Sequence, residues 1–127
     1  MAESATGECL FCRIVRGELG TEFVAESEHN VAFRDLQPQA PVHLLIVPRR
    51  HFGSLREVGA DDGAVTADAL ALATRLAAEQ GLYAGGYRVI TNDGPDAGQT
   101  ISHLHFHVLG GATVSYTHLT LPTTPYV

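Results

Sequence analysis

The alternation of apolar and polar side chains predicts five short strands in this chain. Successive side chains of a strand point to opposite faces, so a half-buried strand alternates between apolar and polar residues. This pattern, or a short apolar run bounded by turn residues, occupies residues 23–26, 31–36, 43–47, 87–91 and 103–109. The connections among the first three strands are short and rich in polar residues or proline. Such connections favour antiparallel neighbours.

Two other segments have apolar or alanine-rich patterns at helical spacing. They cover residues 9–15 and 62–80, and each is soon followed by a glycine. Asp61 or Asp62 stands where it can cap the second helix. The resulting order, α-β-β-β-α-β-β, predicts an α+β domain with two helices and a five-stranded, mostly antiparallel sheet.

The chain of 127 residues is long enough for one domain. We expect residues 1–8 to be a flexible lead-in and residues 9–111 to form that domain. Residues 112–127 contain no charged side chain and are rich in threonine. We therefore expect them to be an atypical, poorly ordered tail.

Charge and composition exclude several classes of protein. The net charge is −6, and all eight basic residues are scattered arginines, which argues against a nucleic-acid-binding face. The absence of lysine excludes Schiff-base catalysis and a P-loop. No segment approaches the ~20 apolar residues of a membrane span. The N-terminal residues do not resemble a secretory signal, and two cysteines make no disulfide framework. These features predict a cytoplasmic protein without membrane contact.

Three of the seven histidines alternate with apolar residues in the strand predicted at residues 103–109. His103, His105 and His107 should therefore share one face, spaced about 6.5–7 Å apart, while their apolar neighbours face the core. The alternative is a polar surface strand in which the histidines have no function, and three histidines in strict alternation disfavour it. Metal coordination and covalent catalysis on phosphorus are the two functional hypotheses, and the spacing does not separate them.

A glycine-rich loop precedes this row. Gly94 and Gly98 permit backbone conformations in which N–H groups converge on an anion. The loop is not a P-loop, because Gln99 stands where that motif requires lysine. We interpret it as a loop that brings Gln99 and Thr100 to a phosphate beside the histidines.

The run His103-Leu104-His105-Phe106-His107-Val108-Leu109 resembles the signature of the histidine triad (HIT) family of nucleotide-binding proteins. Within that family the chain resembles the small nucleoside phosphoramidases. Further matching segments occur in the same order at residues 14–18, 32–36, 39–43, 47–51 and 98–101, so the resemblance covers about residues 8–111.

The resemblance implies a HIT-like fold, a homodimer and a purine nucleotide or nucleotide conjugate as ligand. It implies that His105 attacks the α-phosphorus and becomes nucleotidylated, while His43 and His107 bind or protonate groups around the phosphate. Asp35 matches the carboxylate that holds the ribose. The apolar wall around the base matches Leu10, Phe11, Ile14 and Phe33, and the contacts to the phosphate or leaving group match Asn92, Gly98, Gln99 and Thr100. A dinucleoside polyphosphate hydrolase and a nucleotide-binding regulator with little turnover remain alternatives.

The pair Cys9 and Cys12 lies on one face of the first predicted helix. A thioredoxin-like redox pair is disfavoured because no strand precedes it. The resemblance implies a structural zinc ion held by Cys9, Cys12, His51 and His103; free, partly buried cysteines are the alternative. It also implies that the helix at residues 62–80 and the strand near residues 87–91 form the dimer contacts. The chain departs from the phosphoramidase branch in lacking a tryptophan-containing terminus.

Overall fold

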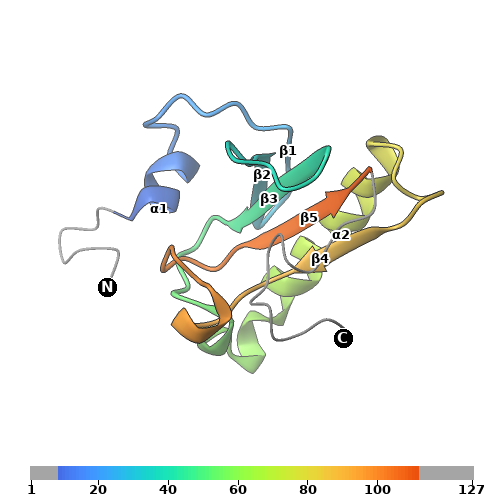
Figure 1. Ribbon diagram of the computed structural model, residues 1–127. Helices are drawn as coiled ribbons and strands as arrows, with labels where there is room; N and C mark the ends of the chain where they lie inside the picture. The colour runs from blue at the N-terminus through green and yellow to red at the C-terminus, as the bar shows by residue number, and fades with distance from the viewer. Residues whose placement is uncertain (1–8, 112–127) are drawn as a thin grey trace.

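The computed structural model describes residues 9–111, which form one five-stranded antiparallel sheet with a helix on each face (Figure 1). The strand order in the sheet is β1-β2-β3-β5-β4. The expected α+β class, strand count and element order are confirmed. The expectations for residues 1–8 and 112–127 lie outside the described residues.

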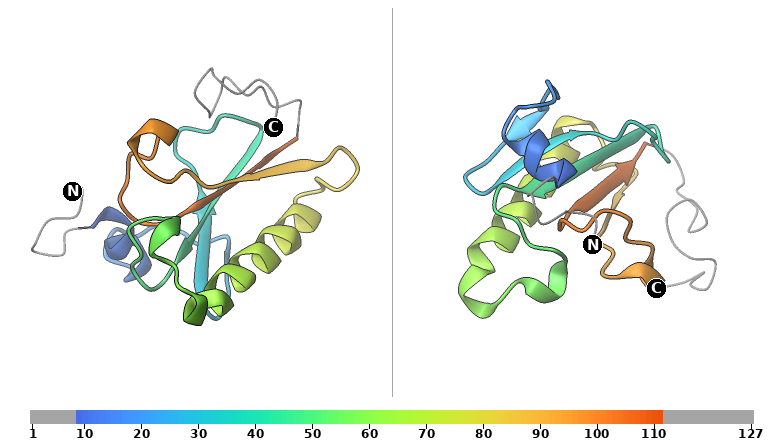
Figure 2. Two further views of the ribbon diagram at one scale, coloured as in Figure 1. Left: turned by 90° about the horizontal axis from the view of Figure 1, so that it is seen from below. Right: turned by 90° about the vertical axis from the view of Figure 1, so that its left-hand side faces the viewer.

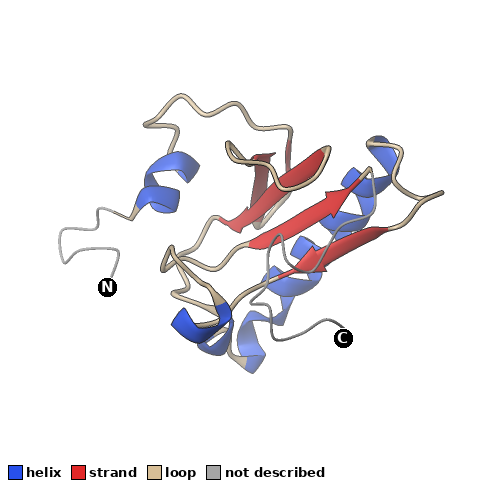
Figure 3. Cartoon of the chain, viewed as in Figure 1, coloured by secondary structure: helices blue, strands red, loops and turns tan. Residues whose placement is uncertain are grey.

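Seven regular elements and three short 3₁₀ turns make up this part of the chain (Figure 3). In chain order they are α1 (Leu10–Val15), β1 (Ala25–Glu26), β2 (Asn30–Arg34), β3 (Val42–Pro48), η1 (Leu55–Glu57), η2 (Ala60–Asp62), α2 (Gly63–Glu79), β4 (Tyr87–Ile90), η3 (Pro95–Ala97) and β5 (Phe106–Gly110).

All five predicted strands have different bounds in the structure, and three of them differ by two residues or more at one end. The first two are shorter and pair only as Ala25–Glu26 and Asn30–Arg34. The predicted strand at residues 103–109 begins only at Phe106, because its pairing with β3 starts there. The preceding residues bond to loops instead: the Leu104 N–H donates to the Phe52 carbonyl. His103 and His105 therefore precede the strand, so only His107 of the three lies on it.

The start of α2 also differs from the prediction. Asp62 occupies the N-cap position, but its carboxylate makes no capping hydrogen bond to the helix. It accepts instead from the backbone N–H of Gly59 at 3.1 Å and from Arg50 at 2.6 Å. At the other end, Gly81 follows the helix with φ of 74°, a left-handed conformation that glycine adopts without steric cost.

The two faces of the sheet carry different chemistry because side chains alternate along each strand. Even-numbered residues of the central strands, such as Leu44, Ile46 and Val108, pack with α2 in one apolar core. Figure 2 shows α2 running along this face. Odd-numbered residues face α1, where a smaller apolar cluster contains Phe33 and Leu45. His43 and His107 share this odd parity, so they lie on the α1 side. His105 lies on the same side, with its ring 5.1 Å from that of Phe11 in α1.

None of the helices within residues 9–111 has both the length and the apolar character needed to cross a membrane.

Candidate functional site

A cavity of about 1140 Å³ opens on the α1 side of the sheet. Its wall includes side chains from α1, the end of β2, β3 and β5. Among the residues singled out from the sequence, the structure brings together Leu10, Phe11, Ile14, Phe33, Asp35, His43, Thr100, His105 and His107 around this cavity.

The strand register explains why two of the histidines meet. Leu45 of β3 lies opposite His107 of β5, and His43 lies opposite Leu109. His43 and His107 are therefore diagonal neighbours on one face of the sheet, a relation that brings long side chains into reach. Their rings approach until Nε2 of His43 lies 2.9 Å from Nδ1 of His107.

His105 is held by a backbone carbonyl. Its Nδ1 lies 2.8 Å from the carbonyl oxygen of His103, and because a carbonyl only accepts, Nδ1 must carry the proton. Nε2 is then left with a free lone pair. The ring packs edge-on against His107 at 5.1 Å and against Phe11 at 5.1 Å between centroids, so its orientation is fixed from both sides.

A second backbone group fixes the tautomers of His43 and His107. The N–H of Gln39 donates to Nδ1 of His43 at 3.0 Å, so the proton of a neutral His43 is on Nε2. The Nε2–H of His43 in turn donates to Nδ1 of His107. A neutral His107 therefore carries its proton on Nε2. The two hydrogen bonds therefore run in one direction, from the Gln39 N–H through His43 to His107, and leave the Nε2–H of His107 as a donor.

Burial keeps these imidazoles neutral. It lowers the pKa of the His107 ring to about 4, with His105 and His43 adding to the shift and Asp35 opposing it. Burial also lowers the pKa of His43 and that of His105, again against the charge of Asp35. Three neutral rings at pH 7 provide one free lone pair and oriented N–H donors rather than a patch of positive charge.

The lowered pKa of His107 makes stability depend on pH. The unfolded chain, with a histidine pKa of about 6.5, takes up this proton at a higher pH than the folded chain does. The free energy of unfolding should therefore fall as pH drops from about 6.5 to 4, by about 3 kcal/mol for His107 alone. Urea denaturation at pH 7.5, 5.5 and 4.5 measures it. His107→Gln should flatten this dependence, and an unchanged slope in that variant would contradict the assignment.

Loop residues 92–101 divide between the cavity and structural roles. Thr100 lines the cavity, whereas Asn92, Gly98 and Gln99 do not belong to its lining. The Gln99 amide donates to the carbonyls of Gly53 and Ile101 at 2.8 and 2.9 Å and accepts from the Gly94 N–H at 2.8 Å. Gln99 therefore ties the loop to the segment after β3.

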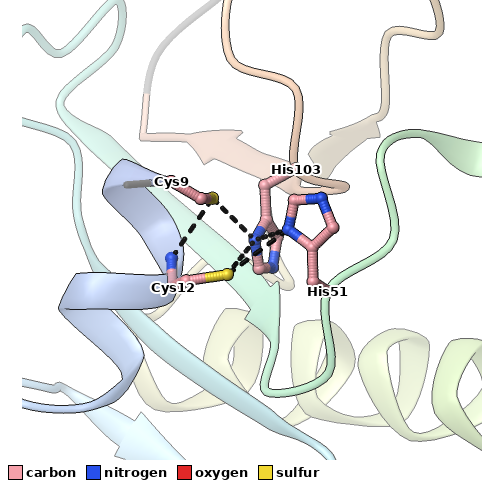
Figure 4. Close-up of side chains that lie close together, drawn as sticks. All are labelled: Cys9, Cys12, His51 and His103. Atoms are coloured by element: carbon pink, nitrogen blue, oxygen red, sulfur yellow. Dashed lines mark hydrogen bonds between the residues drawn. The ribbon is translucent and has the colours of Figure 1, made fainter. Parts of the chain in front are cut away.

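The other candidate cluster joins three distant segments of the chain. Cys9 and Cys12 come from the start of α1, His51 follows β3, and His103 precedes β5 (Figure 4). Nδ1 of His103 lies 3.3 Å from Sγ of Cys9 and 3.5 Å from Sγ of Cys12. Nδ1 of His51 lies 3.3 Å from Sγ of Cys12 and 3.1 Å from Nδ1 of His103.

The geometry and tautomer of this cluster fit a zinc ion. Donors at ordinary zinc–ligand bond lengths in a tetrahedral site would lie about 3.3–3.8 Å apart, and the observed separations are close to that range. Nε2 of His103 lies 3.0 Å from the carbonyl of Pro48, so Nε2 carries the proton and Nδ1 presents its lone pair to the cluster. The cluster is thus compatible with a zinc site of Cys₂His₂ type.

The histidine row is therefore split between two sites. His103 faces the cysteines and is fully buried, whereas His105 and His107 face the cavity. This arrangement disfavours a single zinc site built from all three. Asp35, His43 and His107 also bring ligand atoms within 4.8 Å, but Nε2 of His43 carries a proton because Gln39 occupies Nδ1. No lone pair of His43 is then available to a metal.

Comparison with known proteins gives the family. Residues 16–114 match the HIT domain model. An uncharacterised HIT-like protein of Synechococcus elongatus is 39% identical over 109 residues, spanning 86% of this chain and 95% of that protein. A HIT-like protein of Chlamydia pneumoniae is 42% identical over 102 residues, spanning 80% and 92%. The chain therefore belongs to the HIT family.

Solved structures agree in fold. A HIT family hydrolase from Legionella pneumophila superimposes with a TM-score of 0.80 at 43% identity, covering 83% of this chain and 94% of that one. A histidine triad protein from Clostridium difficile has a TM-score of 0.81 at 37% identity, covering 84% and 93%. A histidine triad nucleotide-binding protein from Candida albicans has a TM-score of 0.72 at 28% identity, covering 87% and 89%.

Sequence reasoning missed the backbone groups that orient the histidines. These are the Gln39 N–H and the carbonyls of Pro48 and His103. Any residue type supplies such groups, so they leave no signature in the sequence. It also missed the contact of Asp35 with His43, whose Oδ2 and Nε2 lie 3.3 Å apart.

Proposed function

We propose that this protein is a nucleotide-binding hydrolase. It cleaves the α-phosphate linkage of nucleoside 5′-phosphoramidates or related nucleotide conjugates through a nucleotidyl-histidine intermediate. The observation that carries the proposal is the tautomer of His105, whose Nδ1–H bond to the His103 carbonyl leaves the Nε2 lone pair free beside the cavity. The Legionella relative described as a HIT family hydrolase supports the reaction class.

The reaction has two steps. Nε2 of His105 forms a bond to the α-phosphorus as the P–N bond breaks, and the departing nitrogen gains a proton. Water then cleaves the nucleotidyl-histidine, which releases the nucleoside monophosphate and restores His105. The His43–His107 pair is placed to donate hydrogen bonds or a proton around the phosphate. A neutral His105 suits the first step, because only the unprotonated ring attacks.

The cavity offers distinct surroundings for the parts of a purine nucleotide. Leu10, Phe11, Ile14 and Phe33 supply an apolar wall for the base, in which the rings of Phe11 and Phe33 meet edge-on at 5.8 Å. Asp35 supplies a carboxylate for the ribose hydroxyls, and Thr100 a hydroxyl near the phosphate. The Candida relative described as nucleotide-binding supports this ligand class.

A structural zinc ion would be held by Cys9, Cys12, His51 and His103. Bound there, the ion would join α1 to the segments around His51 and His103, since all four positions of a tetrahedral site would be filled by protein. His105 and His107 remain for the phosphate.

A homodimer is the proposed assembly. β4 ends the sheet on one side, so its outer edge has no partner strand within residues 9–111. Exposed apolar side chains gather on α2, on β4 and on the turn between them; they are Leu70, Tyr83, Tyr87 and Val89. An unpaired edge beside exposed apolar side chains suits pairing with a second copy.

The test is to trap the covalent intermediate. The protein is mixed briefly with adenosine 5′-phosphoramidate, quenched and mapped by peptide mass spectrometry. We expect an adenylyl group on His105. Side-by-side kinetics with a diadenosine polyphosphate separates the related hydrolase, which would turn that substrate over faster. Tight AMP binding without an adduct or turnover would instead indicate a regulatory binding protein and would overturn the proposal.

A further inference from the structure

Asp35 is anchored so that one of its oxygens faces the histidine pair. It follows the last residue of β2, and its N–H donates to the His43 carbonyl at 3.1 Å, which continues the pairing with β3. Oδ1 accepts from the Gln37 N–H at 2.9 Å. Oδ2 then lies 3.3 Å from Nε2 of His43. The side chain of Asp35 is 22% exposed and that of His43 only 1%.

His43 has one proton to share between two acceptors. Gln39 fixes that proton on Nε2, where Nδ1 of His107 lies at 2.9 Å and Oδ2 of Asp35 at 3.3 Å. The carboxylate carries a full negative charge, so it competes with the neutral His107 ring for the same N–H. What Asp35 binds therefore affects how strongly His43 donates to His107.

The charge of Asp35 also reaches all three imidazoles. It raises the pKa of His43, His105 and His107, against the lowering caused by burial. The other charged side chains around the cavity, Glu22 and Arg34, are exposed. Among the charged side chains around the cavity, Asp35 is therefore the half-buried one, and it contacts His43 of the His43–His107 pair directly.

We propose that Asp35 is a positioning residue that couples ribose recognition to the His43–His107 pair. Ribose hydroxyls that donate to Oδ2 satisfy the carboxylate, and the N–H of His43 then donates fully to His107. This polarises His107 so that its own Nε2–H becomes a stronger donor to the phosphate. The coupling rests on the proposed function, since it assumes that a nucleotide occupies the cavity.

The kinetic test separates a ribose contact from an action through His43. Wild type and Asp35→Asn are assayed with adenosine 5′-phosphoramidate and with its 2′,3′-dideoxy analogue. We expect the analogue to lower kcat of the wild type roughly 10-fold, beyond its effect on KM. The asparagine introduced at this position would carry a neutral amide, which competes more weakly for the His43 N–H. Asp35→Asn should therefore raise KM for the ribose substrate, raise kcat on the dideoxy analogue about 10-fold above the wild-type value, and so remove the difference in kcat between the two substrates. Asp61→Asn, at an exposed carboxylate, is the matched control and should behave as wild type. A difference in kcat between the two substrates that persists in Asp35→Asn would overturn the coupling.

A second measurement needs no turnover. The ¹⁵N imidazole resonances of the whole protein are recorded with no nucleotide, with AMP and with 2′,3′-dideoxy-AMP. We expect Asp35→Asn to shift the Nε2 resonance of His43 and both resonances of His107. AMP should shift them in the wild type more than its dideoxy analogue does. Equal shifts from the two nucleotides would overturn the coupling. If these shifts appear as expected but no phosphoramidate is hydrolysed, the proposed reaction fails while the coupling stands.

Discussion

His105→Ala should lower kcat on adenosine 5′-phosphoramidate by at least about 10³-fold, because it removes the atom proposed to attack phosphorus. No adenylyl adduct should form. Nucleotide binding should remain measurable, since the apolar wall at Leu10, Phe11 and Phe33 and the donor on His107 are untouched. Stopped-flow or fluorogenic kinetics measures the first effect, and isothermal titration calorimetry with AMP measures the second.

His29→Ala is the matched control for this variant. His29 lies in the turn between β1 and β2, outside the residues that line the cavity. Its backbone N–H bonds to Asp68 at 3.1 Å, a contact that alanine retains. The activity of His29→Ala should equal that of the wild type. Full turnover in His105→Ala, or an adduct on another histidine, would refute the role assigned to His105.

If the Cys₂His₂ cluster holds the proposed zinc ion, its removal should lower the melting temperature by more than about 10 °C. A ligand present at about 1,000 times its dissociation constant stabilises the folded state by about 4 kcal/mol, and a domain of this size loses several degrees for each kcal/mol. Differential scanning calorimetry on protein loaded with zinc, and after treatment with a chelator, measures the change. Below the new melting temperature the His105 adduct should still form.

The variant Cys12→Ser gives an independent measure of the same effect. It keeps the size of the side chain but removes the soft thiolate ligand, so its melting temperature should be low and insensitive to the chelator. Elemental analysis should find about one zinc per chain in the wild type and little in the variant. A wild type that melts at the same temperature with and without the chelator would contradict a structural metal.

The fold was largely predictable because its core depends on side-chain periodicity. The alternation at Leu44, Ile46 and Val108 and the spacing of Leu72 and Leu76 follow directly from burial against each other. Strand ends were less predictable, because they depend on where a partner strand stops. The strand β5 begins at Phe106 since its pairing with β3 begins there, and nothing in the apolar pattern of residues 103–105 indicates this.

For the candidate site, the sequence could name candidate side chains but not their geometry. The motif identified the histidines, yet the direction in which each one faces depends on distant backbone groups. Pro48 turns the lone pair of His103 toward the cysteines, and Gln39 sets the proton of His43. The sequence also did not indicate that the Gln99 side chain donates to the Gly53 carbonyl and lies outside the cavity lining.

The position of Phe11 has a thermodynamic consequence. Phe11 stands between Cys9 and Cys12, and its ring lies 5.9 Å from that of His103 and 5.1 Å from that of His105. The Cys₂His₂ cluster and the cavity therefore share one wall, and α1 has to be ordered only once for both. If a metal ion orders this helix, reciprocity requires a ligand of the cavity to tighten metal binding by the same factor. The ratio of metal affinities measured with and without nucleotide then reports the free energy of coupling through the ordering of α1.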